Sequence, residues 1–271
     1  MKKLIKIIGA LVVLFIFYIA NNQWLQVSKH TLQVKTLPKE MNGLTIVQIS
    51  DLHDAKFGRH QQRLIEQVKK QKPDLIFLTG DLIDRNNYKL GRSLEAVDGF
   101  TKIAPTYFVD GNHEISINRV KEIHIALQKR GVHVLNNEAE TFRYNGASIQ
   151  LIGISDPLSG ETTEDMLAKA LVNVPQDQFK ILLAHRSEFG EKYAQAGIDL
   201  AYTGHAHGGQ IRLPLLGGLV NHDASLFPKH TEGIEQVEQL QHVISRGLGN
   251  SLFPLRVFNR PEIVVTTLES K

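Results

Sequence analysis

The sequence contains no cysteine among its 271 residues. This absence excludes a disulfide framework, a thiolate zinc site, an iron–sulfur cluster and a cysteine nucleophile. It leaves the cellular compartment open, because a chain without cysteine is compatible with both reducing and oxidising surroundings.

Two catalytic motifs are absent as well. The sequence has no Gly-Lys-Ser/Thr phosphate-binding loop, which argues against ATP-driven work, and no Gly-x-Ser-x-Gly motif, which argues against a serine hydrolase. Its composition, 42% hydrophobic and 22% charged, is that of an ordinary globular protein rather than a disordered or fibrous one. The length fits one large domain or two small ones.

The body of the chain has no excess of charge of either sign. The formal net charge is +3, and Lys2, Lys3 and Lys6 lie in residues 1–20, which leaves 28 basic residues facing 28 acidic ones. Binding to a nucleic acid polymer through its phosphates requires a basic patch. The sequence therefore predicts no nucleic acid polymer as a partner.

A long apolar run occupies the amino end. Residues 7–20 carry no charge, and Leu4 and Ile5 extend the run to seventeen residues, interrupted by Lys6. A membrane-spanning helix needs about 20 apolar residues, with about 17 as the lower limit, and a lysine near its end can reach the headgroups. Tyr18 and Trp24 lie where aromatic side chains meet the far membrane surface.

This run is compatible with an uncleaved anchor, a cleaved signal peptide or a buried helix. A signal peptide requires small residues before its cleavage site, and Tyr18 occupies the third position before cleavage after Ala20. We therefore expect an uncleaved anchor over residues 1–24, a tether over 25–42 and a catalytic domain over 43–271. Lys2 and Lys3 would stay in the cytoplasm, and the domain would face outward at the cell membrane.

The remainder of the chain alternates short apolar runs with helical patterns, which indicates an α/β fold. Asn145-Gly146 between two alternating runs is a strong hairpin signal. The expected strands are residues 44–49, 75–78, 107–109, 132–135, 141–144, 148–154, 181–184, 200–202, 243–245 and 263–267. The expected helices are residues 60–71, 94–103, 120–129 and 162–172.

Polar residues gather directly after five of these strands. They form the motifs Asp51-Leu52-His53, Gly80-Asp81, Gly111-Asn112-His113-Glu114, His185 and Gly204-His205-Ala206-His207-Gly208. Ligands of open α/β sheets bind at the carboxyl ends of the strands. Five of the twelve histidines fall in these five places, whereas a single histidine at a strand end is more often structural. The combination therefore indicates one shared site.

Aspartate, asparagine and histidine offer the oxygen and imidazole ligands that suit Mn, Fe, Zn or Ni. Asp-x-His and His-x-His place two side chains on the same side of an extended backbone, so both reach one cavity. The set is too large for one tetrahedral ion, so we expect two divalent transition-metal ions. Two ions about 3.5–4 Å apart activate a hydroxide and hold the oxygens of an in-line displacement, which is phosphoester chemistry.

These motifs, in this order, resemble the calcineurin-like metallophosphoesterase superfamily over residues 43–269. The segments SDLHDAKFG, VDGNHE, GHAHGGQIRLP and LFPLRVFNRPEIVVTTL are similar to its membrane-associated bacterial branch of phosphodiesterase-like predicted phosphohydrolases. The resemblance implies an α/β sandwich of two mixed β-sheets flanked by helices, here with an N-terminal transmembrane helix.

The resemblance also implies roles for individual residues. A first metal ion would be held by Asp51, His53 and His207. A second would be held by Asn112, His185 and His205. Asp81 would bridge the two ions, and His113 would face the substrate, to stabilise phosphoryl oxygens or protonate the leaving group. Asp51 and Glu114 are alternative partners for orienting an imidazole, and the sequence does not rank them.

One departure from the branch follows His185, where Arg186-Ser187 replaces a frequent proline. A solvated surface role for Arg186 is favoured over contact with a phosphate. His222 and His230 lie in the loop after the Gly-His-Ala-His motif, which is a candidate wall of the substrate site. Four further histidines are expected to be structural: His60, His124, His133 and His242.

The sequence thus predicts a membrane-anchored, dimetal-dependent phosphoesterase, and a phosphodiesterase in particular, that acts by attack of a metal-bridged hydroxide. The anchor favours a lipid- or cell-wall-linked phosphoester as substrate. A nucleotide phosphodiesterase or phosphatase is the alternative among enzymes. A non-catalytic metal-binding scaffold of the same fold is the alternative outside them, and His113, a motif residue that binds no metal, argues against it.

Overall fold

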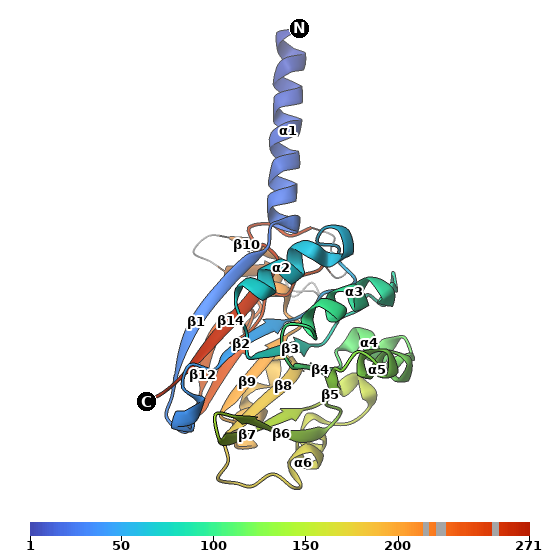
Figure 1. Ribbon diagram of the computed structural model, residues 1–271. Helices are drawn as coiled ribbons and strands as arrows, with labels where there is room; N and C mark the ends of the chain where they lie inside the picture. The colour runs from blue at the N-terminus through green and yellow to red at the C-terminus, as the bar shows by residue number, and fades with distance from the viewer. Residues whose placement is uncertain (214–216, 221–225, 251–254) are drawn as a thin grey trace.

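Two six-stranded β-sheets pack face to face at the centre of the molecule, and one long helix projects from it (Figure 1). This computed structural model describes residues 1–213, 217–220, 226–250 and 255–271. The two-sheet architecture with flanking helices is the fold predicted from the sequence.

The first sheet has the strand order β1-β14-β2-β3-β4-β5. Strands β2 to β5 are parallel, β14 is antiparallel to β2, and β1 is parallel to β14, so the sheet is mixed. Its strands are β1 (Gln26–Val34), β2 (Thr45–Ile49), β3 (Leu75–Thr79), β4 (Thr106–Val109), β5 (His133–Val134) and β14 (Glu262–Ser270).

The second sheet has the order β12-β13-β9-β8-β7-β6 and is also mixed, because its two edge strands are antiparallel to their neighbours. Asn145 and Gly146 join β6 to β7 with positive φ angles of 48° and 88°, as the predicted two-residue turn requires. Its strands are β6 (Glu138–Tyr144), β7 (Ala147–Gly153), β8 (Lys180–Arg186), β9 (Leu200–Gly204), β12 (Gly233–Val237) and β13 (Leu240–Ile244). A separate two-stranded ribbon consists of β10 (Ile211–Leu213) and β11 (Gly217–Val220).

Helices cover the outer face of each sheet. Apolar side chains of α2, α3 and α5 pack on the first sheet, and those of α6 and α7 pack on the second. The helices are α1 (Lys2–Gln23), α2 (Gln62–Lys70), α3 (Leu90–Phe100), α4 (Asn112–Ser116), α5 (Val120–Gln128), α6 (Thr163–Leu171) and α7 (Gly190–Gln195). Short 3-10 turns are η1 (Lys39–Met41), η2 (Arg59–Gln61), η3 (Pro157–Ser159), η4 (Ser187–Phe189) and η5 (His207–Gly209).

An apolar core fills the space between the two sheets. Phe77 of β3 lies at its centre, with its ring 6.2 Å from that of Tyr107 on β4 and 5.1 Å from that of Tyr202 on β9, both edge to face. Such pairs add to the free energy gained from apolar burial. The contacts fix the two sheets relative to each other, and with them the strand ends that carry the motifs.

Helix α1 stands clear of the body (Figure 1), and 6% of its apolar stretch is buried. The helix is long and apolar enough to be a candidate membrane span. The expected tether over residues 25–42 is corrected, because residues 26–34 form the edge strand β1. Its sequence, QVSKHTLQV, is mostly polar, and only Leu32 and Val34 are buried. Its partner β14 lies at the far end of the chain, so no local pattern indicates the pairing.

We predict that Phe77→Ala lowers the free energy of unfolding by about 3–5 kcal/mol, the usual cost of removing a large buried side chain. Phe142→Ala is the matched control, because Phe142 is only partly buried at the margin of the same core. Denaturant titration of the detergent-solubilised chain, followed by near-UV circular dichroism, measures both values. Equal losses for the two variants would contradict the central role of Phe77.

Candidate metal centre

The five sequence motifs meet at the carboxyl ends of β2, β3, β4, β8 and β9. Every one of the seven expected ligands lies here, and all except the half-buried Asn112 are buried. Two groups of side chains have ligand atoms that lie within 4.8 Å of one another. The first consists of Asp51, His53, Asp81 and His207. The second consists of Asp81, His185 and His205.

In the first group the ligand atoms converge from three strand ends. His53 Nε2 lies 3.1 Å from His207 Nε2 and 3.6 Å from Asp81 Oδ2. His207 Nε2 lies 3.4 Å from Asp51 Oδ1. Metal–ligand bonds of 2.0–2.2 Å place neighbouring ligand atoms about 2.8–3.6 Å apart, so these spacings fit one shared cation.

The second group centres on His185. Its Nδ1 donates a hydrogen bond to the carbonyl oxygen of Thr79 at 2.9 Å, so Nε2 points into the site. Asp81 Oδ2, His205 Nδ1 and Asn112 Oδ1 lie 3.3, 3.0 and 3.1 Å from that Nε2. A cation or a proton at this point would be shared by all four atoms.

The pKa values of His185 and Asp81 also indicate a positive charge at this point. Burial alone would lower the pKa of His185, but the carboxylate of Asp81 raises it to about 10. Burial would raise the pKa of Asp81, and the imidazoles of His185 and His53 hold it well below its ordinary value. A proton on His185 thus occupies the position that a metal ion would take, and metal binding would displace it.

The backbone at this site is strained. Five of the seven residues have positive φ angles, between 47° and 68°: Asp51, His53, Asp81, His205 and His207. This conformation is uncommon for residues with a Cβ atom and costs about 1–3 kcal/mol for each residue. Such strain persists only where the surrounding structure holds the backbone in place, and strained residues cluster at functional sites. The five residues therefore indicate a functional site here.

Two glycines allow the ligand-bearing loops to approach each other. A Cβ atom on Gly111 would overlap Asp81, and one on Gly204 would overlap Asp51 and Ser50. Glycine at these positions therefore lets four separate strand ends close around one small volume.

His113 lies beside the two groups with its side chain 3% exposed. The backbone N–H of Arg85 donates to His113 Nδ1 at 3.1 Å, so the proton of the neutral ring resides on Nε2. That atom is 3.9 Å from Asp81 Oδ2, and the ring lies edge to face with His53 at 4.4 Å. Burial lowers the pKa of His113 and so favours this neutral form. The imidazole can therefore donate a hydrogen bond from Nε2 into the site.

The comparisons with known proteins agree with this geometry. The family model described as calcineurin-like phosphoesterase matches residues 44–209. The chain belongs to the calcineurin-like phosphoesterase family. It is a metallophosphoesterase, as predicted from the motifs, and the cluster of aspartate and histidine residues described above is where the family's metal dependence fits this chain.

Individual relatives extend the comparison. The chain is 30% identical over 230 residues to the phosphodiesterase YaeI of Escherichia coli (strain K12), covering 82% of this chain and 81% of that protein. It is 32% identical over 252 residues to a Bos taurus transmembrane protein with metallophosphoesterase domain, covering 88% of this chain and 55% of that protein. The solved phosphopantetheinyl hydrolase of Mycobacterium tuberculosis has the same fold, with a TM-score of 0.53, 12% identity, and coverage of 77% of this chain and 91% of that one.

Glu114 of this metallophosphoesterase holds loops rather than an imidazole. Its carboxylate accepts hydrogen bonds from the backbone N–H groups of Gly111 at 2.8 Å, Asp81 at 2.9 Å and Ile83 at 3.1 Å. Burial and the nearby Asp81 raise its pKa to about 8. Asp51, the other candidate for orienting an imidazole, lies among the ligand atoms, with its Oδ1 3.4 Å from His207 Nε2.

Arg256 and Asn259 support His207 and were not found from the sequence. The fully buried guanidinium of Arg256 donates to the carbonyl oxygens of Arg246 at 2.9 Å and Gly249 at 2.6 Å, and its Nη2 lies 3.3 Å from His207 Nδ1. Asn259 Nδ2 donates to the carbonyl oxygen of His207 at 2.7 Å. The PLRVFNRPE segment contains both residues, but nothing in its spacing indicates that they reach the metallophosphoesterase motifs.

Arg186 is not the solvated side chain expected from the sequence. It pairs with the buried Asp156 through Nε at 2.6 Å and Nη2 at 3.1 Å, and its Nη1 lies 3.0 Å from His205 Nε2. A guanidinium so placed holds a planar carboxylate in two bonds. Arg186 therefore stands at the edge of the candidate metal centre.

The other histidines that the structure describes lie outside the two groups of ligand atoms. Three of them contact carboxylates: His60 contacts Glu95, His124 contacts Asp110, and His133 contacts Glu140. The buried His242 bonds to Thr203. His230 pairs with Glu235, and its carbonyl oxygen accepts from Ser187, next to Arg186. His222 lies outside the described residues.

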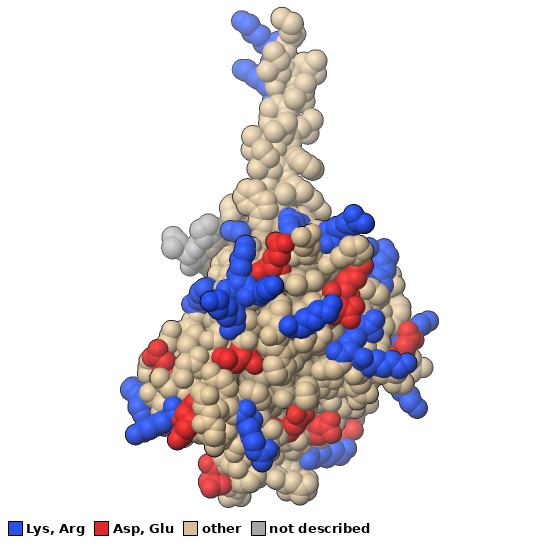
Figure 2. Space-filling view, in the orientation of Figure 1, with Lys and Arg blue, Asp and Glu red and all other residues tan. Residues whose placement is uncertain are grey.

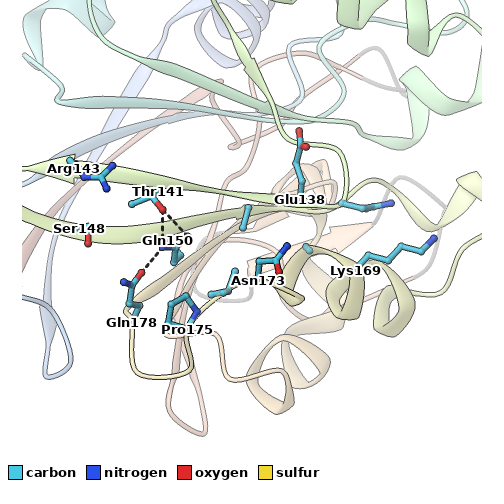
Figure 3. Close-up of a pocket in the computed structure, with 13 residues that line it drawn as sticks. Glu138, Thr141, Arg143, Ser148, Gln150, Lys169, Asn173, Pro175 and Gln178 are labelled. Atoms are coloured by element: carbon cyan, nitrogen blue, oxygen red, sulfur yellow. Dashed lines mark hydrogen bonds between the residues drawn. The ribbon is translucent and has the colours of Figure 1, made fainter.

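A polar cavity of about 500 Å³ lies between the β6–β7 hairpin and the end of α6 (Figure 3). Gln150 on its floor bonds to Thr141 and Gln178, and Lys169 and Asn173 line one side. None of the seven expected metal ligands lines it. This cavity is therefore separate from the candidate metal centre.

We predict that Glu114→Ala lowers the free energy of unfolding by at least about 3 kcal/mol, because an unsatisfied buried donor costs about 1–3 kcal/mol and this variant leaves three. Glu164→Ala is the control, since Glu164 is exposed and bonds only to Lys192 among the described residues. Chemical denaturation of the metal-free chain measures both. A Glu114→Ala variant as stable as the control would show that these three hydrogen bonds do not hold the loops.

Proposed function

We propose that the chain binds two divalent transition-metal ions and hydrolyses a phosphodiester. The observation that carries the proposal is the position of Asp81, whose carboxylate belongs to both groups of ligand atoms. One carboxylate shared by two groups is what a bridged pair of ions requires. Asp51, His53 and His207 hold the first ion in this proposal, and the second is held by Asn112, His185 and His205.

Bound divalent ions would supply Lewis acidity and activate water as the nucleophile. The residues of the chain then have separate tasks. Asp81 balances the positive charge on both sides, and Glu114 fixes the loop that carries it. His113 donates a hydrogen bond from Nε2 to the phosphoryl oxygen or to the leaving-group oxygen, because the N–H of Arg85 occupies its other nitrogen.

The orientation of His113 favours an enzyme over a metal-binding scaffold. A scaffold requires the ligands only, whereas His113 is buried, fixed in one tautomer and directed at the same volume as the ligand atoms. A nucleotide phosphodiesterase or phosphatase remains the alternative activity. The even balance of charge in the body argues against a polynucleotide as substrate but not against a small nucleotide.

We further propose that α1 anchors the protein in the cell membrane, with the catalytic body outside the cytoplasm. The apolar length of α1 and the lysines at its start support this arrangement. The E. coli relative is named a phosphodiesterase and the bovine relative a transmembrane protein. An anchored site would act on a phosphoester near the bilayer, on a lipid or on the cell wall.

We predict that the purified full-length chain contains two metal ions and loses phosphodiester hydrolysis on chelation. His113→Ala should keep both ions and lose about 10²–10³-fold in turnover, the usual contribution of a positioned hydrogen-bond donor. Elemental analysis and hydrolysis of a chromogenic diester and monoester provide the measurements. The matched control is His133→Ala, whose exposed ring contacts Glu140.

Three outcomes of that experiment would overturn parts of the proposal. An active chain with one ion or none would remove the paired metals. Loss of metal from His113→Ala would make His113 a ligand. Faster hydrolysis of the monoester than of the diester would favour a phosphatase.

We predict that protease added to wall-stripped intact cells digests the body, because the positive amino end stays in the cytoplasm. Undigested protein should remain in the membrane pellet after an alkaline wash. A protected body would reverse the orientation. Soluble protein with a new amino end near residue 21 would show a cleaved signal peptide instead of an anchor.

A further inference from the structure

Four large apolar side chains are exposed on the segments that lie next to the metal centre. They are Leu213 (38% exposed), Leu226 (68%), Phe227 (66%) and Phe258 (53%). We call this set the apolar collar. Isolated exposed apolar residues are common, but a group of them on one part of a protein marks an interaction surface.

The members of the collar belong to neighbouring segments. The N–H of Phe227 bonds to the carbonyl oxygen of Leu219 on β11 at 2.9 Å. Strand β11 pairs with β10, and Ile211 of β10 pairs in turn with Val257, the residue before Phe258. Four segments thus lie side by side, and three strand spacings of about 4.8 Å make this surface about 14 Å wide.

Contact with α1 indicates what covers the collar. The ring of Phe258 lies edge to face with that of Phe17, at 5.4 Å between centroids. Phe17 is three residues before the apolar run ends at Ala20, which at 1.5 Å per residue is about 4.5 Å inside that run. If α1 crosses the bilayer, Phe258 therefore lies within the apolar layer too.

The body is fastened closely to the end of α1. Asn22 Oδ1 accepts hydrogen bonds from the backbone N–H of Arg256 at 3.0 Å and from Asn250 Nδ2 at 3.1 Å. Arg63 donates to the side chain of Gln23, and Arg260 donates to the backbone oxygens of Trp24 and Leu25. These contacts join the helix directly to the body, so an anchored α1 would turn this surface of the body toward the membrane.

Charge at this end of the body suits a membrane surface. Arg63 and Arg260 bond to the last residues of α1, and Figure 2 shows Lys and Arg side chains on the part of the body next to that helix. Basic side chains beside apolar ones bind the anionic headgroups of a bilayer. The half-exposed Trp24 adds an aromatic residue of the kind that lies at the interface.

The backbone of the collar is also unusual. Phe227 and Phe258 have positive φ angles of 53° and 50°. Bulky residues rarely adopt this conformation. In water, each position would combine a strained backbone with an aromatic ring exposed to solvent. Transfer of the ring into apolar surroundings would be favourable and would offset the free-energy cost of the strain.

The collar directly adjoins the metal centre. Asn259, next to Phe258, bonds to the carbonyl oxygen of His207. Gly209, two residues after His207, packs against Gly218 of β11 and Pro228, next to Phe227. The apolar surface and the metal ligands are therefore parts of one local structure.

We propose that the apolar collar docks into the bilayer beside α1 and holds the metal centre at the level of the lipid headgroups. This inference rests on the proposed anchoring and deepens the proposed function. It names the substrate class as membrane amphiphiles whose phosphoester lies in the headgroup layer. A soluble nucleotide would gain nothing from this placement.

The absence of cysteine allows a direct test with single-cysteine variants of the full chain. Phe227→Cys reports the collar, Leu11→Cys reports α1, and Val172→Cys is the control. Val172 is 74% exposed and directly follows α6, at the end of the body away from α1 in Figure 1. Each variant carries a small fluorophore and is reconstituted in phosphatidylcholine–phosphatidylglycerol vesicles. Nitroxide on the lipid acyl chain and iodide in the buffer serve as quenchers.

We expect the label at residue 227 to be quenched by the lipid nitroxide several-fold more than the label at 172, and several-fold less by iodide. The label at residue 11 should show strong lipid quenching. If residue 11 is quenched by lipid and residue 227 behaves like residue 172, the collar inference is wrong while the anchor stands. No lipid quenching at residue 11 would overturn both.

A protein partner is the other candidate occupant, and the same experiment addresses it. The vesicles contain no other protein, so a collar made for a protein would leave residue 227 open to iodide. Quenching does not depend on turnover. Loss of metal-dependent hydrolysis in an otherwise docked chain would therefore contradict the proposed catalytic function and not the docking.

Discussion

The central constraint on this molecule is the gathering of acidic and imidazole groups in a buried place. Ionised side chains are costly to bury unless opposite charge or hydrogen bonds compensate them. Asp51 and Asp81 lie at this point with at most 1% of their surface exposed, and their nearest neighbours are histidines. The two-sheet core, the strained loops and the glycines all serve to hold these groups together until a cation balances them.

The supporting interactions show how the fold meets this constraint. Glu114 ties the loop after β3 to the start of α4 through backbone N–H groups, and Arg256 fills the space behind His207 with a guanidinium. Neither side chain belongs to the two groups of ligand atoms. Each fixes a loop that bears ligands, so the precision of the centre depends on buried polar residues as much as on the ligands themselves.

The sequence was informative where the structure is local and weak where it is not. Asp-x-His, Gly-Asn-His-Glu and Gly-His-x-His each follow a short apolar strand, so the strand ends and their residues could be predicted together. Strand β1 could not, because its polar sequence acquires a partner only through β14, more than 230 residues away. Arg186 and Arg256 were missed for the same reason, since their contacts with His205 and His207 arise from tertiary packing.

The pairing of β1 with β14 has a consequence for how the protein is made. Arg256, Asn259 and β14 lie within the last sixteen residues of the chain, yet they complete the edge of the first sheet and the support of His207. The ribosome adds them after all seven expected ligands, so the centre cannot take its final form before this later segment has been made. If the body is exported, it crosses the membrane before this point, and its ions come from the compartment in which folding ends.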